Sequence, residues 1–249
     1  MQRSRWRAAL DWASERAPAL GLAGASFGAA IALGLLPDFR VQHVTVRHQT
    51  ASSDEAVTRA TQLAQVVGRN IFLVNSQSVA QEISAIPSVL RARVIPHLPN
   101  TVEIEIVERK PIATWQSGSG AFLVDDQGYL LAEAPTPDAT PLALRDTTGH
   151  TLQVGDRVNQ RTLLAARELV KALPGAGVRV REVEVGPSGL VFTSEAGWRI
   201  IFGEIAEAKG LNDKLANLAS VAEAAQRNNW KIAVLDLRPK DRPFYQLAP

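Results

Sequence analysis

The stretch LPNTVEIEIVERKPIATW, from Leu98 to Trp115, contains aliphatic and acidic residues in alternation from Val102 onward. The aliphatic residues at every second position are Val102, Ile104 and Ile106. A period of two puts them on one face of a β-strand and leaves Glu103 and Glu105 on the other. Catalytic carboxylates usually lie in pockets that shift their pKa, and an alternating solvated face forms no such pocket. The two glutamates therefore indicate a wet strand face rather than an acid–base pair.

A second alternating stretch precedes this strand and predicts a β-hairpin. VLRARVI, residues 89–95, is followed by the turn-forming PHLPN. Its apolar face comprises Leu90, Ala92 and Val94. Pairing of the strands sets Arg91 and Arg93 near the two glutamates, as cross-strand ion pairs worth about 0.2–1 kcal/mol each. One face of the hairpin then packs on helices and the other faces water.

One strand and two helices are predicted upstream of the hairpin. The β-branched stretch FRVQHVTVR, residues 39–47, indicates the strand. Residues 52–68 have the capping and periodicity of a helix that closes at Gly68. A second helix ends at Pro87 and carries one apolar face, made of Val79, Ile83 and Ile86. The order strand–helix–helix–strand–strand predicts a small α+β module over residues 38–109.

The composition indicates a folded chain of two domains. It has 249 residues, 46% of them hydrophobic, and no cysteine, which excludes disulfides and thiolate metal sites. The net charge of +2 is all accounted for by residues 1–16, which carry four arginines against Asp11 and Glu15. Acidic and basic residues balance in the remainder, so we expect no nucleic-acid partner.

A stretch of 20 residues without a charged side chain, residues 17–36, follows the arginines. As a helix it spans about 30 Å, the thickness of the hydrocarbon core of a bilayer. The arginines on its N-terminal side predict that residues 1–16 are cytoplasmic and residues 38–249 extracytoplasmic. We interpret the stretch as a single transmembrane anchor, in which Gly24 and Gly28 form a small-xxx-small pair.

Two other interpretations of this stretch remain open. A cleaved signal peptide is suggested by Ala30-Ile31-Ala32, although the apolar run is longer than a signal's core. A buried core helix would normally show a polar stripe, and only Ser26 interrupts this run. Length favours the uncleaved anchor.

The second half of the chain is predicted to be strand-rich, with two helices. A hairpin over residues 122–131 turns at Asp126–Gly128. Asn159 caps a helix that Pro174 ends, and another helix covers residues 206–228. The strands are expected at residues 178–185, 189–194, 198–203 and 230–238.

No catalytic motif stands out. The pair Asp125 and Asp126 could indicate metal binding or acid catalysis, but aspartates favour turns through local backbone hydrogen bonds. The four histidines are scattered, and the chain has no H-E-x-x-H, G-x-S-x-G or phosphate-binding loop motif. We therefore expect no catalytic residue, no metal ligand, no cofactor, no small-molecule substrate and no enzymatic activity.

A small module of this order after a single span resembles a POTRA domain, and the chain resembles the FtsQ/DivIB family of bacterial cell-division proteins. The resemblance covers residues from about 17 to about 245. It rests on the strand from Phe39, Gly68–Phe72, Val74-Asn75, Ile86-Pro87, Ala92–Val94, Leu98-Pro99, Glu108–Ala113 leading to Trp115, Gly203, Lys214-Leu215, Leu218 and Asp236–Arg238.

The resemblance implies an α+β architecture in four parts. These are a cytoplasmic tail (1–16), a transmembrane helix (17–37), a POTRA domain (38–109) and a mixed β domain with two helices (110–249). It also implies a non-enzymatic scaffold at the division septum, held in the cytoplasmic membrane by the bilayer around residues 17–36. The implied partners are single-span division proteins of the FtsB/DivIC and FtsL type, through which septal wall synthesis is controlled.

The resemblance places partner binding at the end of the β domain. There a last strand at the sheet edge can accept a strand from a partner. The expected partner-binding residues are Ile232, Val234, Asp236, Arg238, Phe244 and Tyr245. Pro239 and Pro243 cannot donate to a β-ladder and should shorten this edge. The aromatic pair could instead pack back on its own domain.

An alternative function is that of an envelope assembly or secretion factor whose POTRA domain chaperones β-strands. Such proteins usually carry repeated POTRA units and a barrel, and the sequence shows neither a repeat of 70–80 residues nor a set of barrel strands. A membrane-anchored wall hydrolase or protease is a third possibility, which the lack of catalytic motifs disfavours.

Overall fold

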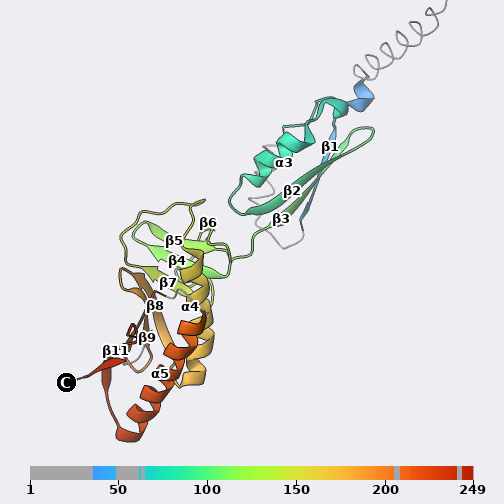
Figure 1. The fold of residues 1–249 in the computed structure, drawn as a ribbon. Coiled ribbons are helices and arrows are strands. Elements are labelled where there is room, and N and C mark those ends of the chain that lie inside the picture. Colours follow the sequence, from blue (N-terminus) through green and yellow to red (C-terminus); the bar gives the residue numbers. More distant parts are fainter. Residues whose placement is uncertain (1–35, 49–61, 63–64, 205–207, 240–242, 249) are drawn as a thin grey trace, which may run out of the picture. The chain divides into compact units, whose positions relative to one another are not determined.

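The computed structural model describes residues 36–48, 62, 65–204, 208–239 and 243–248 (Figure 1). Contacts divide the chain into two compact units. The first ends at Glu108 and the second begins at Arg109, except that residues 86–88 are grouped with the second unit. Within the described part, no helix is long and apolar enough to cross a bilayer. The predicted anchor at 17–36 lies outside the described residues, except for Leu36.

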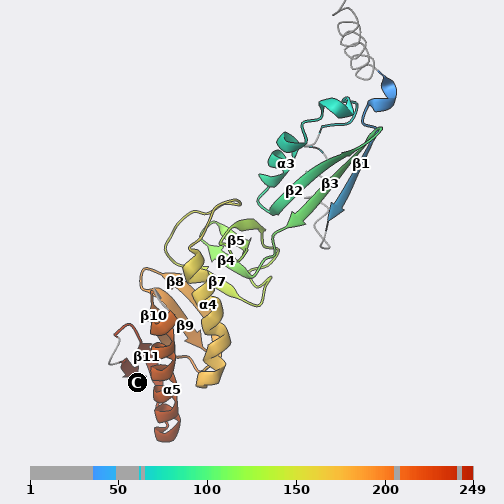
Figure 2. The ribbon, with the colours of Figure 1, turned by 45° about the vertical axis from the view of Figure 1, so that its right-hand side comes forward.

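The first unit is a three-stranded sheet with a helix against it (Figure 2). Its strands are β1 (His43–His48), β2 (Val89–His97) and β3 (Thr101–Glu108), with β3 in the centre. The predicted hairpin is confirmed, since β2 and β3 pair antiparallel. β1 lies on the other side of β3 and runs parallel to it. The alternation in β3 is confirmed as well: Val102, Ile104 and Ile106 are buried.

Short helices complete this unit. η1 (Pro37–Phe39) and η2 (Ile71–Leu73) are 3-10 turns, and α3 (Ser76–Ser84) is the second predicted helix. Val79 and Ile83 of α3 are buried, and so is Ile86 beyond its end. Asn70 and Asn75 cap η2 and α3 through their side-chain oxygens.

Two details of the first unit differ from the prediction, and one predicted helix lies mostly outside the described residues. The first strand begins at His43 rather than Phe39, because Phe39 belongs to η1. The helix predicted over 52–68 falls mostly outside the described residues, and residues 66–69 form a turn. Leu90 does not share a face with Val94: a β-bulge after Val89 shifts the register, so Val89 is buried and Leu90 is 47% exposed.

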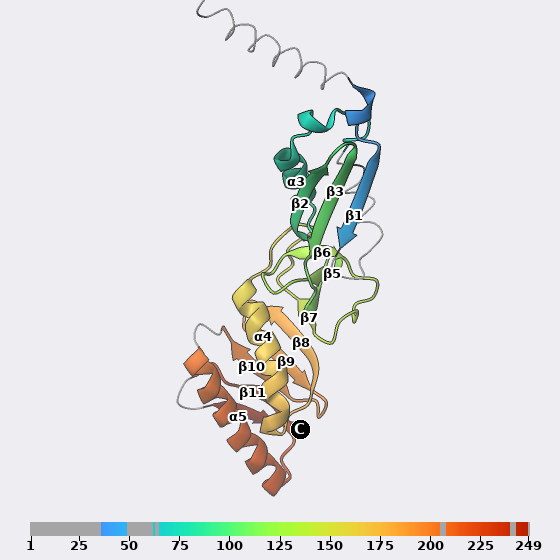
Figure 3. The same cartoon turned by 90° about the vertical axis from the view of Figure 1, so that its right-hand side faces the viewer.

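The second unit is a nine-stranded mixed sheet with both of its helices on one face (Figures 1 and 3). The order across the sheet is β12-β11-β10-β9-β8-β7-β4-β5-β6. In chain order the strands are β4 (Ala113–Ser117), β5 (Gly120–Val124), β6 (Leu130–Glu133), β7 (Ala143–Asp146), β8 (Val180–Gly186), β9 (Gly189–Ser194), β10 (Arg199–Gly203), β11 (Ile232–Asp236) and β12 (Phe244–Leu247).

The two helices and the inner face of the sheet form one core. α4 (Gln160–Ala172) begins at its Asn159 cap, as predicted, and continues into η3 (Leu173–Ala176); α5 covers Ala208–Asn228. Buried residues of these helices pack against strand residues such as Phe192 and Phe202. The helical members of the core are Leu163, Ala166, Leu169, Leu173, Leu218, Ala222 and Ala225. The hairpin over 122–131, the four strands predicted after residue 177 and the two predicted helices are confirmed, whereas β4, β7 and β12 were not predicted as strands.

Candidate partner-binding site

The sheet of the second unit ends at β12, which lies beyond the strand that was expected to form the edge. β12 pairs antiparallel with β11, with Phe244 opposite Asp236 and Tyr245 opposite Leu235. β11 pairs in parallel with β10 on its other side. The expectation that the strand from Ile232 forms the edge is therefore wrong. β12 runs antiparallel to β11, and this short segment after Pro243 becomes the edge instead.

The side chains of β12 explain why so short a strand stays on the sheet. Tyr245 stacks on Trp230, with ring centroids 5.4 Å apart and planes at 19°. Trp230 itself packs against the core. Phe244 is on the opposite face and is 64% exposed. Of the two aromatic residues proposed as contacts, one therefore packs largely on its own domain and the other points to solvent.

The backbone of β12 offers hydrogen-bonding groups to the free edge. Ala248 donates its N–H to the carbonyl of Lys231, so the backbone groups of Ala248 face inward. Successive residues of a strand direct these groups to opposite sides. Gln246 thus faces β11, whereas Tyr245 and Leu247 turn their N–H and C=O groups outward. An unpaired edge of this kind is a template for another strand.

Exposed apolar side chains gather on this edge. In the described part of the second unit the large hydrophobic residues that are exposed are Val154, Phe244, Tyr245 and Leu247. Three of these four belong to the four-residue strand β12. Exposed large hydrophobic residues are therefore concentrated on this strand and are not spread over the described surface of the unit. Clustered exposed apolar residues mark interaction sites more often than scattered ones do.

The residues of β11 that were expected to bind a partner have different environments. Ile232 is 3% exposed and belongs to the core, so its side chain offers no contact surface. Val234 and Asp236 are half-buried and stand next to β12. Arg238 follows β11 and remains exposed. Sequence reasoning missed Leu247, although the run FYQL directly after Pro243 was the available signal.

A charged group borders the edge. Arg238 donates to both carboxylate oxygens of Asp236, its Nε lying 3.0 Å from Oδ1 and its Nη2 2.6 Å from Oδ2. The Arg238 hydrogen bond holds the pKa of Asp236 below its ordinary value, and the carboxylate raises the pKa of Arg238. Lys214 of α5 donates to the carbonyl of Phe202, and burial lowers the pKa of its ammonium group.

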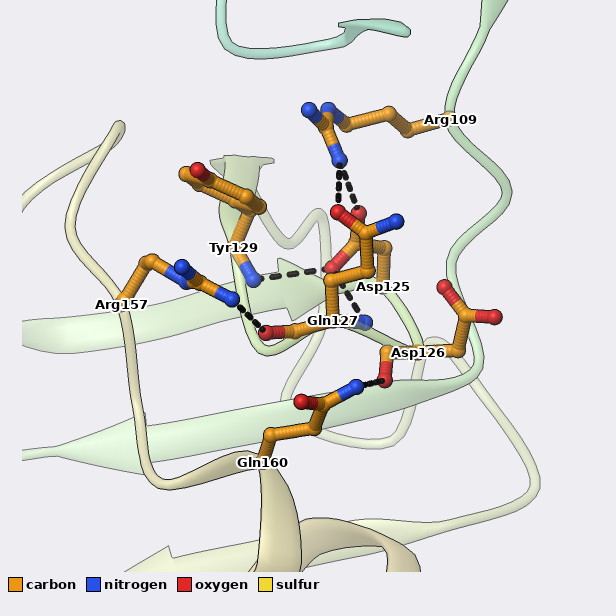
Figure 4. Close-up of polar contacts among 7 residues, drawn as sticks. All are labelled: Arg109, Asp125, Asp126, Gln127, Tyr129, Arg157 and Gln160. Carbon is orange, nitrogen blue, oxygen red and sulfur yellow. Dashed lines mark hydrogen bonds and ion pairs between the residues drawn. The ribbon is translucent and has the colours of Figure 1, made fainter.

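The aspartates that could have indicated chemistry serve a turn instead (Figure 4). Asp125 is 2% exposed, and its Oδ1 accepts the backbone N–H groups of Gln127 (2.9 Å) and Tyr129 (2.8 Å). Its Oδ2 accepts from Arg109 at 2.7 Å. The neighbouring Asp126 is exposed. The interpretation as turn-forming aspartates is confirmed for Asp125, whose two oxygens both have partners.

Arg109, where the second unit begins, is fixed by this turn. Its guanidinium also lies over the ring of Tyr129, 4.3 Å from the centroid, and Arg157 lies at 4.4 Å from the same ring. Arg157 in turn donates to the carbonyl of Gln127. The arginine of the motif Glu108–Ala113 thus binds the β5–β6 turn by an ion pair and by cation–π contact (Figure 4).

The glutamates of β3 are paired on the solvated face, as predicted, but not entirely with the predicted partners. Glu105 lies 4.0 Å from Arg93 of β2. Glu103 instead contacts Arg47 of β1 at 2.5 Å and His97 at 2.8 Å. Among the described residues no group of three or more His, Cys, Asp or Glu side chains is arranged to hold a metal ion.

Comparison with known proteins defines the class first. Residues 39–109 match the family model for the FtsQ-type POTRA domain, and residues 113–238 match that for the C-terminal domain of the cell division proteins FtsQ and DivIB. The chain is thus a two-domain protein of the cell-division class.

Individual relatives agree with the domain matches. The cell division protein FtsQ of Chloroflexus aurantiacus is 32% identical over 85% of this chain and 75% of its own length. That of Chloroflexus aggregans is 31% identical over 84% of this chain and 74% of its own length. FtsQ of Mycobacterium leprae is 28% identical over 78% of this chain and 54% of its own. The chain belongs to the FtsQ/DivIB family of cell division proteins.

Proposed function

We propose that this protein is a non-enzymatic scaffold that recruits and positions single-span partners of the FtsB/DivIC and FtsL type at the division septum. In this proposal residues 1–16 are cytoplasmic, residues 17–37 cross the cytoplasmic membrane, and the POTRA domain (38–109) and β domain (110–249) lie outside. The family assignment supports a role in cell division. The uncharged stretch 17–36 supports the anchor.

The partner binds by adding a strand to β12. The observation that carries this proposal is the free edge itself, on which Phe244, Tyr245 and Leu247 are 64%, 40% and 46% exposed. The outward backbone groups of Tyr245 and Leu247 supply hydrogen bonds, and the exposed side chains supply apolar contact. Since β12 has only four residues, the ladder it can accept is short. Side-chain contacts must therefore provide much of the affinity.

The charged pair next to the edge adds selectivity. Arg238 is exposed beside Asp236 and can meet an acidic side chain on the incoming strand. Its charge is partly compensated by Asp236, so its contribution to affinity is small compared with that of the aromatic anchor. The contact set we propose is thus Val234, Asp236, Arg238, Phe244, Tyr245 and Leu247, with Ile232 removed.

Substitutions at Leu247 separate backbone from side-chain binding. Leu247→Ala removes the side chain but keeps the outward N–H, and Leu247→Pro removes both. We expect the alanine variant to bind the FtsB-type partner with roughly three- to fivefold lower affinity than the native chain. The proline variant should bind roughly tenfold more weakly than the alanine variant, because it also loses one or two backbone hydrogen bonds. Affinity is measured by titrating the full anchored chain with partner in detergent.

The controls lie on the same domain. Val154→Ala changes an exposed apolar residue away from β12 and should leave binding unchanged. Phe244→Ala should weaken binding about tenfold. Equal affinities of all four variants, with unchanged thermal unfolding, would reject strand addition at β12.

A fluorescent fusion that forms a band at mid-cell supports the division scaffold, whereas an even envelope signal supports the strand-chaperone alternative.

A further inference from the structure

The POTRA unit carries a second group of exposed apolar side chains, far from β12 in the sequence. We call it the juxtamembrane patch, and it comprises the exposed residues Leu36, Phe72 and Leu73 together with the half-buried Phe39. Leu36, Phe72 and Leu73 are 44%, 52% and 77% exposed. The rings of Phe39 and Phe72 touch, with centroids 5.2 Å apart. All three ribbon views place η1 (blue) and η2 (teal) at the same end of this unit (Figures 1, 2 and 3).

The backbone holds the patch in place. Gly68 donates to the carbonyl of Val41 at 2.8 Å, and Val41 donates to that of Arg69 at 2.9 Å. Arg40 and Asn70 form a β-bridge beside these bonds. Below them Val41 and Ile71 are buried. Because the η2 turn is anchored through Ile71, the two residues that follow it are forced outward, and their exposure is a property of the fold.

The patch follows directly after the proposed membrane span. Leu36 is the last residue of the uncharged stretch, and η1 covers the next three residues. At about 2 Å per residue, a 3-10 turn puts Phe39 roughly 6 Å beyond the end of the span. The headgroup layer on each side of a bilayer is about 5–7 Å thick. Phe39, and Phe72 in contact with it, must therefore lie at the level of the lipid headgroups.

The charges around the patch suit an anionic surface. Arg40 and Arg69 are exposed, and neither makes an ion pair with another residue of the described part of the chain. Arginines at this depth can pair with lipid phosphates, while the aromatic and aliphatic side chains enter the interface. Two acidic residues lie nearby, Asp38 on η1 itself and Glu82 of α3, which lines one hollow with Arg69 and Leu73.

We propose that the juxtamembrane patch docks the POTRA unit on the outer surface of the bilayer, with Phe39, Phe72 and Leu73 in the interface and Arg40 and Arg69 on anionic headgroups. This inference rests on the proposed anchor at 17–36. A docked unit cannot swing freely about the end of the span. The bilayer thereby sets the orientation in which the POTRA unit is presented to other division proteins.

The lack of cysteine allows a direct test on the full chain. Single variants Leu73→Cys and Leu90→Cys are labelled with an environment-sensitive fluorophore and reconstituted in vesicles of phosphatidylglycerol and phosphatidylcholine, some of them with nitroxide-bearing lipid. Leu90 is the matched control, because it is 47% exposed in the same unit. It lies at the Glu108 end of β3, whereas β1 starts at the Thr101 end, roughly 20 Å away.

We expect the label at position 73 to be quenched severalfold more than that at position 90. Quenching should fall when Arg40→Gln and Arg69→Gln are combined, or when phosphatidylglycerol is left out. Equal, weak quenching at 73 and 90 overturns the proposal. So does shielding at 73 that appears only with a second copy or the FtsB-type partner, which would make the patch a protein interface.

A third label separates failure of the patch from failure of the anchor. Ala29→Cys lies within the proposed span and, on a helix, faces another side than Gly24 and Gly28. Quenching at 29 without quenching at 73 overturns the docking and leaves the anchor standing. No quenching at either position overturns both. Partner binding of the Leu73→Cys chain, which depends on β12, reports on the scaffold function independently.

Discussion

Tyr245 of β12 stacks on Trp230, with ring centroids 5.4 Å apart and an angle of 19° between the planes. This contact joins the edge strand to the core, so we predict that Tyr245→Ala loosens β12 without unfolding the domain. Amide hydrogen exchange at Gln246 and Ala248, whose N–H groups face β11, should become roughly fivefold faster, which corresponds to the value of one aromatic pair, about 1 kcal/mol. Tyr245→Phe keeps the ring and should exchange like the native chain. Unchanged protection in the alanine variant would show that the stack does not hold the strand.

The turn around Asp125 predicts a large cost for a single substitution. Asp125→Ala removes an ion pair with Arg109 and two acceptors for backbone N–H groups in a buried place. We expect a loss of about 3 kcal/mol in the free energy of unfolding, measured with urea. Asp126→Ala, at the exposed neighbour, should change it by less than about 0.5 kcal/mol. Similar losses for both would contradict the structural role of Asp125.

Acid should weaken the β domain partly through Asp236. Its pKa is lowered in the folded state by the hydrogen bond from Arg238, so the folded chain binds fewer protons than the unfolded chain. The stabilisation is complete above the ordinary aspartate pKa of about 3.9 and is lost as the pH falls through the lower folded value. Because the pair is partly exposed, we expect about 0.5–1 kcal/mol.

The comparison for this pH effect is Asp236→Asn. Its free energy of unfolding should decline less steeply than that of the native chain below about pH 4, while the two chains run parallel between pH 6 and 8. Urea titrations at a series of pH values supply the curves. Curves that are parallel over the whole acid range would exclude a contribution from Asp236.

Gly128 occupies a place that admits no side chain. Its φ is +85°, and a Cβ there would lie 2.6 Å from the carbonyl oxygen of Val158. Gly149 also has a positive φ, of +82°, but open space around it. We predict that Gly149→Ala costs about 1 kcal/mol, from backbone strain alone, and that Gly128→Ala costs at least 2 kcal/mol more, because the β5–β6 turn must move. Equal melting temperatures for the two variants would refute the close packing.

Strong periodicity made most of the fold predictable. The hairpin of β2 and β3, the Asn159-capped α4 and the long α5 each extend over enough residues for their alternation or helical spacing to identify them. The bulge at Leu90 was not predictable, because the extra residue leaves the local pattern unchanged and depends on the register with β3. The Arg47–Glu103 contact likewise requires β1 to lie beside β3, a non-local pairing.

The candidate site was predicted in part for a similar reason. Phe244 and Tyr245 were identified by their aromatic character, but the proline residues around them argued against a strand. Only the return of the chain to β11 turns residues 244–247 into the edge and moves β11 inside. The burial of Ile232 depends on its packing against α5 and the rest of the core, and the sequence around Ile232 alone does not indicate this packing.

The parallel pairing of β1 with β3 also bears on how this protein responds to force. The chain enters β1 at His43, opposite Thr101, and leaves β3 at Glu108. Tension between the proposed membrane anchor and the β domain would thus pull the two strands from opposite ends of the ladder. Such a load shears the inter-strand hydrogen bonds together instead of peeling them one after another. We therefore expect the POTRA unit to unfold slowly when it is loaded between its N-terminal end and the β domain.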